Sequence, residues 1–509
     1  MPENLGKTLW QDRRIRASLG LALVIRLFIL GYLAVYPGGI MAKIDTKDYH
    51  EIAQNLLHYH CFARGKMPAA GTGPTAILQG IPPRTEETAL ILDPYRTPVY
   101  PAFLALIYGI GGGPYLAIIV QSILSLLLIW LTILLAARLF QPEIGWMVAL
   151  LAAIEPLSLI YSHELMSDSL FTMLIVAAVY LFQPLLTNRA QTRSLKYAAF
   201  GGLLLGLAIL TRPVGIYFPV LLLILWMVWR LSKGRQRAEE ISVVTIKPQT
   251  GPLVGNSPGL KYLAVFVLVT TVTASTWAVR NYSIFHHVLI SVCSDYTLLG
   301  TITSEIVAKV RTPEGRPSSS KVPVELQHEL TAQMEREGLN AASEPERAAY
   351  FRRFSLGIIK AHPALFIRYY LKGVCLLFFP DIPSFYELLG FSREGRGGWG
   401  VMFQQGVKAA LVTYFGPYWF LWLAAGLPLI LYDLGVYVLA LWGMVALWRN
   451  RGFYLLFMLL ALIGYWVAVS GIVGFQRYRL PLMPFMIILA AWGWFNLRQA
   501  APAGGGRHK

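Results

Sequence analysis

Apolar segments long enough to cross a membrane recur along the whole chain, and they decide which folds are open to it. A helix needs about 20 mainly apolar residues to cross the hydrocarbon core. Inside lipid, a helix also satisfies all of its own backbone polar groups. By this criterion we expect about twelve spans, near residues 17–36, 115–138, 144–162, 165–184, 195–211, 213–230, 261–279, 362–380, 409–431, 433–448, 453–474 and 481–497. The sequence therefore predicts an all-α polytopic membrane protein.

Composition agrees with a membrane protein and excludes other classes. Of 509 residues, 56% are hydrophobic and only 14% are charged, and a soluble protein of this kind would expose large apolar patches. The net charge of +17 is typical of basic cytoplasmic loops, and no basic soluble module that would bind nucleic acid is visible. Three cysteines are too few for a disulfide framework, so Cys61 and Cys293 form either one bridge or two free thiols.

The basic loops indicate which side of the membrane each segment faces. Under this count of spans they all lie on one side, which the positive-inside rule makes cytoplasmic. These loops contain Arg13, Arg14, Arg16, Arg138, Arg230, Arg449, Arg451 and Arg498. We therefore expect one transmembrane domain over residues 1–497, with outer loops at 37–114 and 280–361, and a cytoplasmic tail at 498–509. The apolar piece from Pro98 to Ile110 is too short to span, and we expect it to lie at the interface.

Charged residues gather where helices leave the membrane on the outer side. The stretch "IDTKDYHEIAQNLL" follows the first span directly, and Asp45 and Tyr49 are four residues apart, so a helix would place them on one face. Asp45 and Asp48 would also suit a simple helix N-terminus, where carboxylates are favourable. The stretch "YSHELMSDSLF" brings Glu164 and Asp168, together with His163, to another outer junction.

Arginines accompany these carboxylates on the same face. Arg96 follows Tyr95 in "DPYRTPVYPAF", and the other arginines of this set are Arg212, Arg280, Arg477 and Arg479. Each arginine alone is typical of a headgroup anchor. Together with carboxylates they favour a reaction in which a carboxylate takes a proton from a hydroxyl group and guanidinium groups neutralise a phosphate.

The order of these short motifs resembles that of a known family. The pattern D-x-x-x-Y is followed by "RTPVYPAFLA", "SDSLF", "LTRP", "WAVRNY" and "RYRLPLMPF". This order, from about residue 17 to residue 497, resembles the GT-C fold membrane glycosyltransferases. The chain looks most like bacterial members of the dolichyl-phosphate-mannose protein mannosyltransferase superfamily, which includes the aminoarabinose transferase of lipid A. The resemblance implies that residues 1–497 form a catalytic domain of about twelve transmembrane helices with interfacial helices in the outer loops.

The resemblance also implies a reaction and a location. It implies inverting transfer of a sugar, a hexose or a pentose, from a polyprenyl-phosphate carrier to an acceptor hydroxyl. The acceptor would be a lipid, a polysaccharide or a protein. The active site would face the outside of the bacterial plasma membrane. No cofactor is required by this mechanism, although the carboxylates and the phosphate would also accept a divalent cation.

Site residues carry over from the family position by position. Asp45 matches the aspartate thought to activate the acceptor, and Asp168, with Glu164 nearby, matches the acidic position of the second outer loop. Arg96 matches the basic residue that would contact the carrier phosphate. Further phosphate contacts are expected from Lys47, Arg212, Arg280, Arg477 and Arg479, and supporting contacts from Tyr49, Tyr95 and His163.

The chain departs from the family pattern at two positions. Family members favour Asp-Glu at the start of the first motif, where this chain has Asp45-Thr46. The aminoarabinose transferase has arginine just before the motif tyrosine, where this chain has Asp48. One phosphate contact must therefore come from elsewhere, and the identity of the sugar cannot be copied from the family.

The sequence also suggests an ion pair, a candidate metal site and an alternative function. Arg26 and Glu155 fall near the middle of their spans, and we expect them to form an ion pair because unpaired charges there are costly. The "HYHC" stretch (His58, His60 and Cys61) has metal-ligand residue types but no recognised spacing, which favours a polar loop. The alternative function is a transporter or flippase of lipid-linked sugars, although such proteins usually show repeated halves and midplane polar sites.

Overall fold

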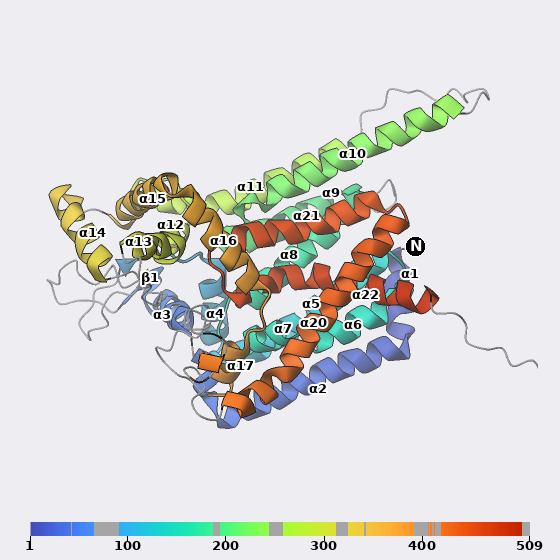
Figure 1. Ribbon diagram of the computed structural model, residues 1–509, viewed down its shortest axis with the longest axis horizontal. Helices are drawn as coiled ribbons and strands as arrows, with labels where there is room; N and C mark the ends of the chain where they lie inside the picture. Colours follow the sequence, from blue (N-terminus) through green and yellow to red (C-terminus); the bar gives the residue numbers. More distant parts are fainter. Residues whose placement is uncertain are drawn as a thin grey trace, which may run out of the picture.

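The computed structural model describes residues 2–41, 43–65, 91–186, 194–243, 258–311, 324–339, 343–390, 406, 408–409, 412 and 419–500. A bundle of long helices occupies one part of the molecule, and a group of shorter helices covers one end of it (Figure 1). The all-α polytopic architecture predicted from the sequence is confirmed, since eight described helices are long and apolar enough to cross a membrane. The number rises to nine if the bent pair α6–α7 is one span.

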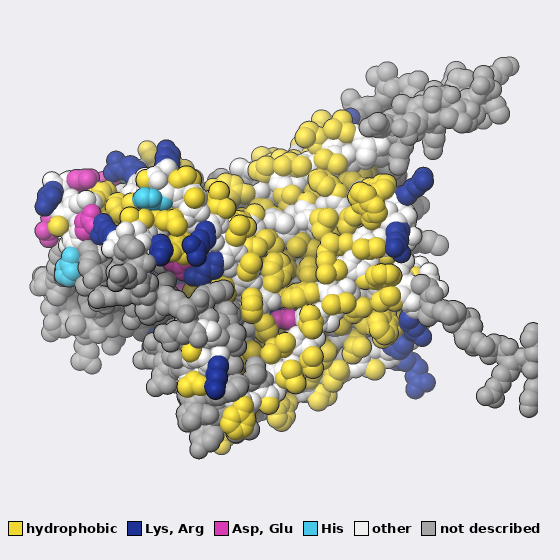
Figure 2. All heavy atoms as spheres, in the orientation of Figure 1, with side chains coloured by type: hydrophobic (Ala, Val, Ile, Leu, Met, Phe, Trp, Pro, Cys, Tyr) yellow, Lys and Arg dark blue, Asp and Glu magenta, His cyan; other side chains and the backbone are white. Residues whose placement is uncertain are grey.

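The bundle contains helices from both ends of the chain. Its elements are α2 (Arg13–Val35), α5 (Pro114–Leu139), α6 (Gly145–Ala153), α7 (Pro156–Ser162), α8 (Asp168–Phe182), α9 (Leu195–Ile209), α10 (Phe218–Val243), α11 (Pro258–Phe285), α20 (Trp419–Arg449), α21 (Phe453–Ser470) and α22 (Met483–Ala500). Short elements flank them: α1 (Pro2–Gln11), η3 (Pro142–Ile144), η4 (Gln183–Leu186), η6 (Pro213–Tyr217) and η9 (Gln476–Leu482). Apolar side chains form a broad belt across the face of the bundle that Figure 2 shows, as expected for a lipid-facing surface.

The end of the bundle that we expect to face outward is built from two groups of short elements. The first group is η1 (Pro37–Met41), α3 (Ile44–Tyr59), β1 (Ala63–Arg64), β2 (Ile91–Leu92) and α4 (Val99–Gly109). Strands β1 and β2 pair in antiparallel fashion. The second group is α12 (Cys293–Leu298), η7 (Leu299–Thr303), α13 (Ser304–Arg311), α14 (Val324–Arg336), α15 (Glu344–Ala361), α16 (Pro363–Leu377) and α17 (Ile382–Leu388). This second group has a small apolar core of its own, which includes Leu326, Leu330 and Phe351.

Several of the expected spans differ in the structure. The expected spans 195–211 and 362–380 correspond to α9 and α16, which have only 15 residues each and are not among the described helices that qualify as spans. The expected spans 409–431 and 433–448 meet at Asp433, but Asp433 lies inside the continuous helix α20. The guanidinium of Arg479 lies 2.7 Å from Asp433 and neutralises it, so the helix can continue past this carboxylate.

The expected ion pair between Arg26 and Glu155 is not formed. Arg26 donates to Ser125 Oγ at 2.6 Å, to Ser158 Oγ at 3.3 Å and to backbone carbonyls of α2 and α6. Glu155 instead accepts the backbone N–H groups of Leu157 and Ser158 at the start of α7. Glu155 therefore caps a helix inside the bundle at a 55° break between α6 and α7, and Ser158 connects the two charged groups.

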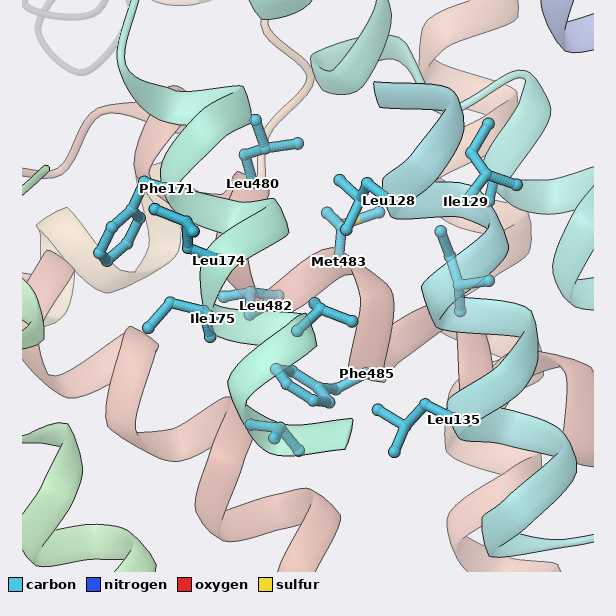
Figure 3. Close-up of a cluster of buried hydrophobic side chains, with 14 of the residues drawn as sticks. Leu128, Ile129, Leu135, Phe171, Leu174, Ile175, Leu480, Leu482, Met483 and Phe485 are labelled. Carbon is cyan, nitrogen blue, oxygen red and sulfur yellow. The ribbon is translucent and has the colours of Figure 1, made fainter. Parts of the chain in front are cut away.

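The core of the bundle is closely packed around the last helix. Leu135 of α5, Ile175 of α8 and Phe485 of α22 belong to one buried apolar cluster, part of which Figure 3 shows. Lipid tails are as apolar as these side chains, so association of the helices depends on close packing rather than on escape from water. Small residues allow the closest approach, because a Cβ atom on Gly443 would lie 2.1 Å from the Leu489 carbonyl oxygen.

Gly443→Ala should therefore destabilise the protein. Its Cβ would overlap the backbone of α22, and overpacking a closely packed contact costs about 1–3 kcal/mol. We expect a thermal transition several degrees lower for the detergent-solubilised variant, measured by fluorescence-detected size exclusion after heating. Gly435→Ala on the same helix is the control, because nothing lies within 4 Å of its Cβ position. Equal transitions for both variants would contradict the packing role of Gly443.

Candidate active site

Two arginines hold the carboxylate of Asp45, which lies in the first turn of α3. Arg96 Nη2 lies 2.7 Å from Oδ1, and Arg477 Nη2 lies 2.7 Å from Oδ2. Arg96 precedes α4 and Arg477 belongs to η9, so the contact joins three segments that are distant in sequence. Burial alone would raise the pKa of Asp45, but the charges and hydrogen bonds of Arg96 and Arg477 outweigh it and lower the pKa. Asp45 is therefore ionised at neutral pH.

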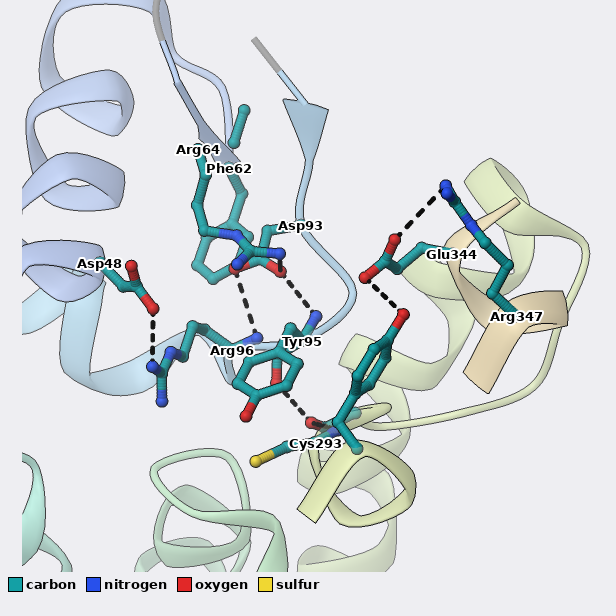
Figure 4. Close-up of polar contacts among 12 residues, drawn as sticks. Asp48, Phe62, Arg64, Asp93, Tyr95, Arg96, Cys293, Glu344 and Arg347 are labelled. Carbon is teal, nitrogen blue, oxygen red and sulfur yellow. Dashed lines mark hydrogen bonds and ion pairs between the residues drawn. The ribbon is translucent and has the colours of Figure 1, made fainter. Parts of the chain in front are cut away.

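The same Arg96 nitrogen, Nη2, also pairs with the carboxylate of Asp48. Its Nη2 also lies 2.7 Å from Asp48 Oδ2, and its guanidinium lies 4.9 Å from the ring centres of both Tyr49 and Tyr95. Figure 4 shows this side chain reaching from the segment before α4 toward Asp48. Asp48, which departs from the family pattern, thus shares the same arginine as Asp45.

The segment that carries Arg96 is itself fixed by Asp93. The carboxylate of Asp93 accepts the backbone N–H of Tyr95 at 2.6 Å and that of Arg96 at 3.3 Å. Arg64 on β1 lies 3.4 Å from the same carboxylate (Figure 4). Because Asp93 is fully buried, these partners compensate the cost of removing its charge from water. The short sheet and this turn therefore set the direction of Arg96.

A second buried pair lies beside the first. Asp168, the first residue of α8, accepts a hydrogen bond on Oδ1 from Arg212 Nη1. Its Oδ2 is buried and has no hydrogen-bond partner among the described residues. The Arg212 guanidinium lies 4.8 Å from the ring centre of Tyr478, whose hydroxyl accepts a hydrogen bond from Arg477 at 2.9 Å. Tyr478 thus connects the Asp168–Arg212 pair to the arginine that holds Asp45.

Tyr49 joins α3 to the start of α8. Its hydroxyl lies 3.2 Å from Ser167 Oγ, directly before Asp168, and its ring meets the edge of Tyr100. The spacing of Asp45 and Tyr49 on α3 therefore places one residue at the Arg96–Arg477 contact and the other toward Asp168.

Glu164 lies in the turn between α7 and α8 without a hydrogen-bond partner. The residue is 0% exposed, and neither carboxylate oxygen has a partner among the described residues. Burial raises the pKa of Glu164 to about 8, and the nearby charge of Lys43 only partly opposes this effect, while Glu387 and Asp381 add to it. Glu164 is therefore largely protonated at neutral pH.

Four of the expected site residues lie apart from this group. Arg479 is 1% exposed and pairs with Asp433, as described above. Arg280 stacks on Trp277 at 4.6 Å and donates to the carbonyl oxygens of Asp93 and Phe62. Lys47 is exposed on α3.

His163 is the fourth expected site residue that lies apart from this group, and it contacts residues in the interior of the bundle. Its Nδ1 lies 2.6 Å from the Leu159 carbonyl oxygen, and its Nε2 lies 3.2 Å from Ser122 Oγ. The structure thus brings together Asp45, Tyr49, Tyr95, Arg96, Asp168, Arg212 and Arg477. Sequence reasoning missed Asp93 and Tyr478, although Asp93 stands three residues before Arg96 in "DPYR" and Tyr478 stands between Arg477 and Arg479 in "RYR".

The described residues contain no group of three or more His, Cys, Asp or Glu side chains that could hold a metal ion. His50 contacts the Tyr108 hydroxyl at 3.0 Å. Cys61 and Cys293 are both free thiols. Of the two alternatives that the sequence left open for these cysteines, the structure has the unbridged one.

Glu164→Gln should change how stability depends on pH. Because the folded protein holds the proton of Glu164 up to about pH 8 and the unfolded chain releases it near its ordinary value, ionisation of Glu164 lowers stability as pH rises between these values. We expect the variant and the parent to melt alike near pH 5, and the variant to melt at a higher temperature near pH 8. A difference in melting temperature that does not grow with pH would contradict this assignment.

Comparison with known proteins finds one matching family model and several solved structures of low sequence identity. Residues 95–246 match the family model of dolichyl-phosphate-mannose-protein mannosyltransferase, a stretch that contains Arg96, Asp168 and Arg212. No curated protein matches the chain.

Solved structures are similar at low identity. The apo oligosaccharyltransferase of Archaeoglobus fulgidus shares 16% identity over 98% of this chain and 53% of its own, with a TM-score of 0.46. ArnT from Cupriavidus metallidurans bound to undecaprenyl phosphate shares 14% identity over 95% of this chain and 78% of its own, with a TM-score of 0.35. This chain spans about half the length of the archaeal protein. The family match confirms, over residues 95–246, the resemblance to dolichyl-phosphate-mannose-protein mannosyltransferase.

Proposed function

We propose that this protein is an inverting glycosyltransferase that moves a sugar from a polyprenyl-phosphate carrier to an acceptor hydroxyl. The observation that carries the proposal is the position of Asp45 between Arg96 and Arg477. A carboxylate base and guanidinium groups that can bind phosphate lie within one hydrogen bond of each other at the outer end of the bundle. The match to the mannosyltransferase family supports the same class of reaction.

The proposed chemistry uses each group once. Asp45 takes the proton of the acceptor hydroxyl while the oxygen of that hydroxyl attacks the anomeric carbon of the sugar from the face opposite the phosphate. The bond between that carbon and the phosphate oxygen breaks, and its electron pair stays on the leaving polyprenyl phosphate. Arg96 and Arg477 offset the charge that develops there, in a site where low-dielectric surroundings strengthen the interaction.

Asp168 supports the acceptor in this proposal. Its Oδ1 is held by Arg212, while Oδ2 has no partner among the described residues and remains able to accept a hydrogen bond. A second hydroxyl of the acceptor or of the sugar would donate a hydrogen bond to this oxygen, since a buried carboxylate oxygen without a partner is costly. Glu164, protonated at neutral pH, would act nearby as a hydrogen-bond donor rather than as a base.

The membrane setting suits a lipid-linked donor. The basic residues Arg449, Arg451 and Arg498 lie in or next to the last turns of α20 and α22, which we assign to the cytoplasmic side, and α3, which carries Asp45, lies at the opposite end of the bundle (Figure 1). We therefore propose a site on the outer face of a bacterial plasma membrane, where the polyprenyl tail would lie against the apolar belt. The sugar would be a hexose or a pentose, and the acceptor a lipid, a polysaccharide or a protein.

One assay separates this function from transport of lipid-linked sugars. Purified protein in detergent is given radiolabelled polyprenyl-phosphate sugars with cell-envelope extracts as acceptors. A transferase releases label from the carrier only when acceptor is present. Movement of intact lipid-linked sugar across a proteoliposome membrane, without release of label, would favour the transporter.

Asp45→Asn should abolish transfer and leave insertion and folding intact. The amide keeps the shape of the side chain but cannot accept the proton, and loss of a general base typically costs 10²–10⁴-fold in rate, so we expect a loss of about 10²-fold or more. Glu305→Gln is the matched control, because Glu305 pairs with Lys372 in the outer helices, away from this site. Retained turnover by a well-expressed Asp45→Asn protein would overturn the role of Asp45.

A further inference from the structure

Both oxygens of Asp45 are engaged by charged donors. One oxygen lies 2.7 Å from Arg96 and the other lies 2.7 Å from Arg477. The two guanidinium groups that a phosphate would need are thus already paired with the carboxylate that an acceptor hydroxyl would need. Each role in the proposed reaction therefore competes with the other for the same contact.

We propose that the carrier phosphate replaces Asp45 as the partner of Arg477 and Arg96, so that binding of the donor releases the base. This inference rests on the proposed function and specifies how its two halves are coupled. Phosphate and carboxylate both match the planar fork of arginine, so one anion can take the place of the other with few other changes. The exchange requires no covalent step.

The exposure of the three groups allows this exchange. The side chains of Asp45 and Arg477 are 22% and 18% exposed, whereas Asp168 is fully buried in its own arginine pair. An anion arriving from the outer side can therefore reach the Asp45–Arg477 contact directly. The Asp168–Arg212 pair would stay closed during the same event.

Asp48 keeps Arg96 in place when Asp45 is released. The same Nη2 atom contacts Asp48 at 2.7 Å, and the guanidinium is also flanked by the rings of Tyr49 and Tyr95. Arg477 has no such second carboxylate among its described hydrogen bonds, because its other partner is the hydroxyl of Tyr478. Arg477 is thus the half of the contact that moves, and Asp48 is a positioning residue for the other half.

An order of binding follows from this coupling. With both oxygens engaged, Asp45 accepts a proton poorly, and its depressed pKa has the same cause. Once phosphate takes the guanidinium groups, the carboxylate loses two charged hydrogen-bond donors, and its basicity rises. The donor would bind first and the acceptor second, which limits transfer to complexes in which both substrates are present.

Direct binding of undecaprenyl phosphate tests the exchange without a known acceptor. If Asp45 competes with phosphate, Asp45→Asn should bind undecaprenyl phosphate about tenfold more tightly than the parent, a gain of about 1.4 kcal/mol, even though it no longer transfers sugar. Affinity is measured in detergent micelles by microscale thermophoresis, with size exclusion as the check on folding. Arg477→Gln should bind the same lipid at least tenfold more weakly.

Asp48→Asn is the matched control for charge. It removes one negative charge from the same nitrogen of Arg96 but leaves Asp45 on both arginines. We expect a change in affinity of less than about threefold. Equal tightening by Asp45→Asn and Asp48→Asn would overturn the exchange in favour of a general effect of charge. Unchanged or weaker binding by Asp45→Asn would overturn it as well.

The two proposals fail in different ways. If the parent transfers sugar but Asp45→Asn does not bind undecaprenyl phosphate more tightly, the exchange is wrong and the transferase assignment stands. If the parent neither binds undecaprenyl phosphate nor releases label from any carrier-linked sugar, the proposed function itself is wrong. Asp45→Ser repeats the binding test in case the asparagine variant does not fold.

Discussion

Ion pairs between arginines and carboxylates, all at least partly removed from water, determine how the end of the molecule that carries α3 and α4 is assembled. A charge removed from water costs several kcal/mol unless a partner of opposite sign reaches it. Asp45, Asp93, Asp168 and Asp433 each meet an arginine from a distant segment. The Asp45–Arg477 pair ties α3 to η9, the Asp168–Arg212 pair ties α8 to the turn before η6, and the Asp433–Arg479 pair ties α20 to η9. The apolar belt places the helices in the membrane, whereas these ion pairs fix which ends meet.

The same pairs explain how far the sequence could be interpreted. Long apolar windows identify most of the bundle because a span in lipid must be a helix of about 20 residues. The motifs around Asp45, Arg96, Asp168, Arg212 and Arg477 indicate residues that do meet in the structure. Their partners could not be predicted, because the choice between neighbouring arginines depends on tertiary packing. Arg477 and Arg479 are two residues apart, yet the first reaches Asp45 and the second reaches Asp433 in the bundle.

The differences from the sequence-based expectations have a common physical cause. The sequence predicts two separate spans on either side of residue 432, and it predicts an ion pair between Arg26 and Glu155 because a lone charge in lipid is costly. In the structure, Arg479 compensates Asp433, while serine hydroxyls and carbonyls solvate Arg26. The backbone N–H groups at the start of α7 donate hydrogen bonds to Glu155 and stabilise its carboxyl group. Hydrogen bonds to neutral groups can therefore replace an ion pair, and hydropathy gives no signal of them.

The close contact between α20 and α22 has a consequence for the distant outer face. Gly443 and Gly493 let the two backbones touch near the end of the bundle that we assign to the cytoplasm. Helix α22 follows η9 directly, and η9 carries Arg477. The contact at these glycines thus fixes the position of α22, and with it the position of Arg477 at the other end of the bundle. A substitution that separates α20 from α22 would therefore shift Arg477 relative to Asp45, although the two sites lie at opposite ends of the bundle.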